Sequence, residues 1–211
     1  GFDKKAIAER KKLIQKKIDL NFTYNLFIEY YNQSLAYKKI DSVAQQEALL
    51  IKAYDLIGKS KQQNLSDKKL VIISSLIKFY ALKKNLKKAT IYIQQAETES
   101  KDVDPTSFDY AMFLRAKAYY FILLKDYNNA LGFAKSSLFH TTKVNHVEGI
   151  LESNELLSSI HTALGNSKKA LNYYKKYTRT KDSIYTITKL NALSYYQTLY
   201  ETERKEKEIN L

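Results

Sequence analysis

Three short segments of this chain repeat one pattern at a near-constant spacing. The segments span 79–89, 123–131 and 163–171, and in each an apolar stretch is followed by a polar turn and then by an alanine. The alanines Ala89, Ala130 and Ala170 are 41 and 40 residues apart (130 − 89 and 170 − 130). A period of this size predicts stacked helical hairpins, because each unit can bury its apolar face only against its neighbours. Such a stack more often offers a surface to a partner than carries its own chemistry.

The scarcity of helix-breaking residues supports this prediction. The chain of 211 residues is 45% hydrophobic and has one proline and five glycines, a composition that suits long helices joined by short turns. No stretch alternates apolar and polar residues as a strand would. The absence of cysteine excludes disulfides, thiolate metal ligands and thiol nucleophiles.

The net charge of +13 invites a comparison with nucleic-acid-binding proteins. Only four of the 35 basic residues are arginines, the side chain that leads direct base readout. The lysines are spread along all the expected helices. We therefore expect a solvated lysine-rich surface, with an anion-binding face as the alternative, and no direct binding of nucleic acid by this fragment. A basic helical nucleic-acid-binding protein is the less favoured alternative function.

The last repeat resembles a tetratricopeptide repeat. That family's pattern alternates large apolar, small and aromatic residues around a turn glycine, and this chain matches it at Leu157, Ser158, Gly165, Ala170 and Tyr174. His161 and Tyr177 depart from it. The two middle repeats fit less closely, and the third fits only if its first helix is about two residues longer. A degenerate first repeat would place Ala44 or Ala48 at the position of the packing alanine.

The resemblance implies an all-α fold, a right-handed α–α superhelix of the tetratricopeptide type with a long C-terminal helix. We expect a basic N-terminal helix in 1–21 and repeats over 22–181. The repeat boundaries are placed at 22–66, 67–104, 105–145 and 146–181. The C-terminal capping or linker helix occupies 182–211, separate from a helix over 167–177. Its apolar residues are expected to pack on the preceding helix pair: Ile184, Ile187, Leu190, Leu193, Tyr196 and Tyr200.

The C-terminal segment carries a second resemblance. Lys181-Asp182-Ser183 and the charged run at 199–209 are similar to the junction that ends the tetratricopeptide sensor regions of Bacteroidetes signalling proteins. There a histidine kinase or a helix-turn-helix DNA-binding domain follows as the output module. The resemblance implies a sensory region of a two-component or transcription-regulating protein. It also implies an extracytoplasmic location when a membrane segment follows, with a cytoplasmic location as the alternative.

No motif in the sequence indicates catalysis. The histidines His140, His146 and His161 lack the spacing of metal ligands, and a structural or solvated role is expected for each. Glu152 and Glu155 share one face of an expected helix, where a solvated pair is the simpler interpretation. We expect no cofactor, no metal and no enzymatic activity in this fragment.

The expected site is the concave face, which in tetratricopeptide proteins is lined by the first helix of each pair. By repeat position, its residues are Ser74, Lys78, Tyr110, Phe113, Lys117, Tyr120, Glu155, Ser159 and Thr162. Aromatic rings beside a lysine suit a peptide or protein ligand, although Phe113 and Tyr120 could instead belong to the core between repeats. Self-association through the C-terminal helix and a stand-alone adaptor without an output module are further possibilities.

Overall fold

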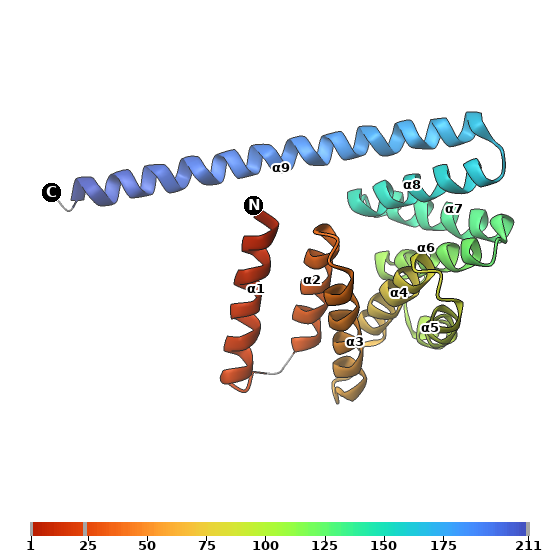
Figure 1. Cartoon of the computed structure of the whole chain (residues 1–211), viewed down its shortest axis with the longest axis horizontal. Helices are drawn as coiled ribbons and strands as arrows, with labels where there is room; N and C mark the ends of the chain where they lie inside the picture. Colours follow the sequence, from red (N-terminus) through yellow and green to blue (C-terminus); the bar gives the residue numbers. More distant parts are fainter. Residues whose placement is uncertain (1, 23–24, 210–211) are drawn as a thin grey trace. The chain divides into compact units, whose positions relative to one another are not determined.

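The computed structural model describes residues 2–22 and 25–209, and Figure 1 shows them as a series of helices. The side chains of residues 2, 3, 192, 196, 199 and 203–209 are not described, so the packing expected of Tyr196 lies outside the described residues. The chain divides into two compact units, Gly1–Gly149 and Ile150–Leu211. Each unit is described by itself.

The first unit contains seven helices of the described chain, which follow one another as packed neighbours (Figure 1). Helix α2 packs on α3, α4 packs on both α5 and α6, and α6 packs on α7, while α1 covers α2. Their bounds are α1 Phe2–Asp19, α2 Leu26–Lys39, α3 Val43–Lys59, α4 Ser66–Leu82, α5 Leu86–Glu99, α6 Phe108–Leu123 and α7 Tyr127–Lys143, with a short 3₁₀ turn at Ser100–Asp102. The all-helical repeat fold expected from the sequence is thus confirmed.

One turn geometry recurs between the helices of each pair. The last turn residue has a positive φ in each case: Asp41 (53°), Lys84 (55°), Lys125 (61°) and Gly165 (73°). The next residue donates its backbone N–H to a carbonyl five positions back, a bond that satisfies an acceptor left over at the helix end. The Asn85 and Asp126 side chains then accept a bond from the first turn of the following helix. This shared turn is the structural basis of the near-constant spacing.

Each packing alanine lies four positions after the residue that follows the positive-φ turn position. Ala89 and Ala130 are fully buried, and their N–H groups donate to Asn85 and Asp126. In the first pair the same position is Gln46, which donates to Ser42, whereas Ala44 and Ala48 are exposed. The expectation that either alanine packs there is therefore wrong. A larger side chain at this position explains why the sequence pattern fades at the start of the array.

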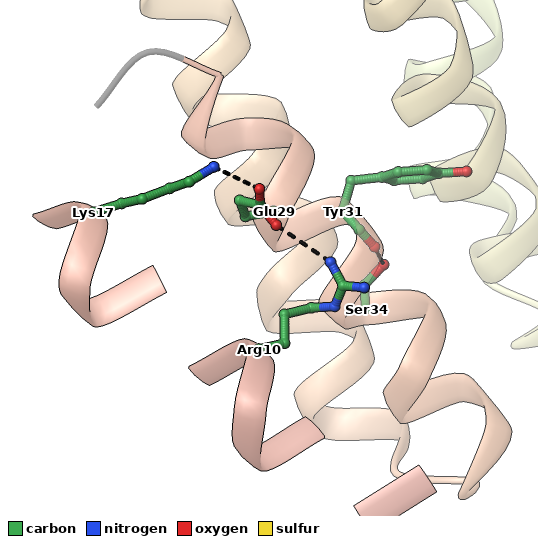
Figure 2. A network of polar contacts seen from close by, with 5 residues as sticks. All are labelled: Arg10, Lys17, Glu29, Tyr31 and Ser34. Carbon is green, nitrogen blue, oxygen red and sulfur yellow. Dashed lines mark hydrogen bonds and ion pairs between the residues drawn. The ribbon is translucent and has the colours of Figure 1, made fainter. Parts of the chain in front are cut away.

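Helix α1 is held to α2 by charge as well as by apolar contact. Ile7 and Ile14 are buried, and the Glu29 carboxylate of α2 accepts bonds from Arg10 (3.2 Å) and Lys17 (2.6 Å) of α1. Figure 2 shows the two basic side chains of α1 reaching Glu29, each at a different carboxylate oxygen. On the same helix the Ser34 hydroxyl donates to the Tyr31 carbonyl (2.6 Å). The basic first helix is therefore an ordered part of the first unit.

The second unit consists of most of α8 (Val147–Ala163) and the whole of α9 (Ser167–Ile209). The hydroxyl of Ser158 donates to the Ala170 carbonyl (2.9 Å), and the His161 ring stacks on Tyr173. These contacts join α8 to the first turns of α9. None of the helices in the described part of the chain combines the length and the apolar character that crossing a bilayer requires.

Helix α9 corrects two expectations. The helices expected at 167–177 and 182–211 are one continuous helix of 43 residues, because the segment between them contains neither glycine nor proline. The expected packing of its apolar residues on the preceding helix pair is also wrong, because the large apolar side chains described beyond Ile184 are exposed. The exposed ones include Ile187, Leu190, Leu193 and Tyr200.

Candidate partner-binding face

Two of the expected contact residues lie in the core. Ser74 of α4 and Phe113 of α6 are each 2% exposed. Phe113 belongs to an apolar cluster with Leu70, Ile73 and Ile77 of α4. Neither side chain is accessible to a partner, which corrects the prediction for both. The reason is register: each lies one position along its helix from a half-buried stripe.

Two of the other expected residues of α6 contact the preceding helix α5. The Lys117 ammonium donates to Glu97 (2.9 Å) and lies over the Phe133 ring of α7 (4.7 Å). The Tyr120 and Thr90 hydroxyls are 3.2 Å apart. Tyr110 meets the edge of the Phe113 ring. All three are half-buried between successive helices, so most of their area serves contact between repeats.

Lys78 does lie among half-buried side chains that come from successive first helices. Its ammonium stands 5.0 Å from the centre of the Tyr119 ring of α6. One turn earlier on α4, the Ser75 hydroxyl lies 3.3 Å from the Tyr31 hydroxyl of α2. We call Tyr31, Ser75, Lys78 and Tyr119 the first-helix row. All four are half-buried, and together they join α2, α4 and α6.

Sequence reasoning missed three members of this row. Ser75 and Lys78 stand three apart, in the helical period, and Val71 extends the stripe by a further turn. That spacing could have selected Ser75 rather than Ser74. On α6 the uncertain repeat register placed the face on Tyr120 instead of its neighbour Tyr119. Tyr31 falls in the first pair, where the family pattern gives no register.

The expected residues of the second unit are exposed on α8. The hydroxyl of Ser159 donates to the Glu155 carbonyl (3.2 Å), and that of Thr162 donates to the Ser158 carbonyl (3.0 Å). Both hydroxyls bond to backbone carbonyls of α8 itself, a common arrangement for hydroxyl side chains within helices. Glu155 extends into solvent. Their role in binding stays a prediction.

A polar triad joins the first helix pair to the second. The Tyr80 hydroxyl donates to Glu47 (2.7 Å), and the Lys88 ammonium donates to both Glu47 (3.1 Å) and Tyr80 (3.2 Å). The bond from Tyr80 holds the pKa of the Glu47 carboxyl below its ordinary value of 4.5. Burial, helped by the hydrogen bond to Glu47, raises the pKa of the Tyr80 phenol to about 12. The triad links α3, α4 and α5 and gives them a fixed spacing.

Two of the histidines have structural contacts. His146 stacks on Phe108 with ring centres 3.7 Å apart, and its Nδ1 accepts a bond from the Gly149 N–H (3.0 Å) at the start of α8. His161 is buried against Tyr173. Within the described residues, no three histidine, aspartate or glutamate side chains gather in a way that could hold a metal ion.

Comparisons with known proteins give the class of fold. No protein-family model and no curated protein matches the sequence. Among solved structures, BtubC from P. vanneervenii superposes with a TM-score of 0.53 at 15% identity, over 87% of this chain and 92% of that one. A Signal Transduction ATPase with Numerous Domains from Pyrococcus horikoshii, which has a tetratricopeptide repeat sensor, gives 0.53 at 20% identity, over 84% of this chain and 28% of that one. At these identities the likeness shows an all-helical repeat fold that a tetratricopeptide protein shares.

Proposed function

We propose that this chain is a non-catalytic helical-repeat region that binds a peptide or a segment of a partner protein along the first-helix row. The observation that carries the proposal is the continuity of Tyr31, Ser75, Lys78 and Tyr119 across three successive first helices. A row of this kind contacts an extended ligand at several points. The tetratricopeptide sensor named for the Pyrococcus protein is consistent with a role in recognition.

The chemistry of the row suggests an acidic or carboxylate-bearing ligand. The Lys78 ammonium supplies a cation whose position is fixed by the Tyr119 ring. The hydroxyls of Tyr31 and Ser75 can donate to or accept from a peptide backbone. Aromatic rings give contact area at low entropic cost. We expect these groups to recognise backbone and charge together, as peptide-binding surfaces commonly do.

The finer proposal is that the chain is the sensory region of a bacterial signalling protein of the histidine-kinase or helix-turn-helix type. Ligand binding would bias the position of α9 and so the state of an output module beyond it. The resemblance of 199–209 to the Bacteroidetes junction supports this proposal. The repeat boundaries and an extracytoplasmic location are proposed together with it. Deletion of 183–211 from the full-length protein should abolish the response. An unaltered response would favour the stand-alone adaptor.

Binding along the row can be tested with a displayed library of random peptides selected on the whole chain. We expect the selected peptides to be rich in Asp and Glu, and their affinity to fall at least about tenfold in Lys78→Ala and Tyr119→Ala. The matched controls are Lys125→Ala in the turn between α6 and α7 and Tyr127→Ala at the first residue of α7. Equal losses in both pairs of variants would contradict the assignment of the site.

A further inference from the structure

Four of the large apolar side chains that are exposed in 185–200 of α9 lie along one side of the helix, whereas Ile187 and Tyr195 are exposed elsewhere around it. Tyr185, Leu193 and Tyr200 are 68%, 56% and 68% exposed, and at 100° per residue they fall within about 80° of one another around the helix. Leu190, 60% exposed, borders this stripe about 60° from Leu193. We call these four residues the α9 stripe. An apolar face of this kind on a solvated helix marks a contact with another protein surface.

The area of the stripe suits a second copy of the same helix. Each of the four side chains leaves on the order of 100 Å² uncovered. Two stripes placed face to face would therefore bury on the order of 1,000 Å² in total, counting neighbouring methylenes, which is where specific interfaces begin. A self-complementary stripe also fits the two-fold symmetry that most homodimers adopt.

The charges of α9 decide the orientation. Its first half, 167–189, has seven basic residues and one acidic residue, a net charge of +6, whereas 190–209 has three basic and four acidic residues, a net charge of −1. A parallel pair would set the two +6 halves side by side. An antiparallel pair centred near residue 195 keeps the two +6 halves apart. It sets 181–189 of each copy, with two basic residues and one acidic residue, against 201–209 of the other copy, with four acidic and three basic residues, and it also opposes the two helix dipoles.

We propose that the α9 stripe pairs with the α9 stripe of a second copy of this chain in an antiparallel helix pair centred near residue 195. Lys189 and Glu201, both exposed, lie six residues on either side of that centre. Each lysine then lies next to the glutamate of the other copy, twice in one dimer. The proposal does not depend on the peptide ligand of the first-helix row.

Sedimentation velocity over a range of concentrations tests the pairing with the whole chain. We expect a monomer–dimer equilibrium with a dissociation constant in the micromolar range. Leu193→Asp should raise the dissociation constant at least about tenfold. Asn191→Asp adds the same charge about 160° from Leu193 around the helix and should change the dissociation constant less than about twofold. A wild-type chain that stays monomeric throughout, or equal losses in the two variants, would overturn the proposal. Far-UV circular dichroism verifies that each variant is folded.

A charge exchange tests the orientation. In the antiparallel pair Lys189→Glu and Glu201→Lys each set like charges together and should weaken association about threefold to tenfold. The double variant K189E/E201K restores opposite charges and should recover wild-type association. In a parallel pair Lys189 faces Lys189 of the partner subunit, so the exchange would give no recovery. Absence of recovery therefore overturns the antiparallel arrangement.

Discussion

Helix α4 and residues 185–200 of α9 both carry many large apolar side chains, but these side chains have opposite environments. In α4, nine of 17 residues are buried, among them Leu76 and Tyr80. In α9, the large apolar side chains described beyond Ile184 are exposed, among them Leu190 and Tyr185. The comparison shows that apolar content alone does not place a helix in the core. A helix is buried when its neighbours in the repeat cover it on several sides.

The largest expected contrast is between a buried and an exposed leucine. Leu76→Ala removes a fully buried side chain of α4 and should lower the free energy of unfolding by about 2–5 kcal/mol. Leu190→Ala should change it by less than about 0.5 kcal/mol in dilute protein, since Leu190 is exposed. Urea unfolding measures both. Comparable losses would mean that α9 is covered within a single chain.

Tyrosine gives a smaller contrast with a defined pH dependence. Tyr80→Phe removes the donor to Glu47 and should cost about 1–2 kcal/mol at neutral pH, whereas Tyr185→Phe should cost almost nothing. Because this bond lowers the pKa of Glu47, its contribution is present above the ordinary value of 4.5 and is lost as the pH falls below it. Unfolding at pH 7 and pH 3 measures the difference. A cost of Tyr80→Phe that does not shrink at pH 3 would contradict this role of Glu47.

The smallest contrast concerns surface charge. Glu29→Gln weakens the bonds from Arg10 and Lys17 and should cost about 0.5–1 kcal/mol, less at high salt. Hydrogen exchange should show that α1 loses protection before α4 does. Glu201→Gln on α9 is the matched control, and no change in the stability of dilute protein is expected. If α1 keeps its protection in Glu29→Gln, its attachment depends on Ile7 and Ile14 alone.

The sequence predicted the repeat and its turns well because both depend on local chemistry. The positions of Ala89, Ala130 and Ala170 follow from one turn geometry repeated along the chain. The continuity of α9 could also have been predicted, because nothing between 178 and 182 ends a helix.

The candidate face was harder to predict because it depends on register. Lys78 was found, but Ser74 and Phe113 are core residues beside the accessible positions. An error of one residue turns a helical side chain by about 100°, from the surface into the core. Only packing between helices fixes that angle, and the weakly matching middle repeats leave it open. Periodicity likewise identifies the α9 stripe but says nothing about what covers it.

Hydrogen exchange of one chain at two concentrations tests the central comparison most directly. Helix α4 should be equally protected in dilute and concentrated protein, because its partners are α3, α5 and α6 of the same chain. Residues 185–200 of α9 should exchange rapidly in dilute protein and become protected as the concentration rises through the micromolar range. Protection of this segment that is already complete at the lowest concentration would contradict the account, because the stripe would then be covered by its own chain.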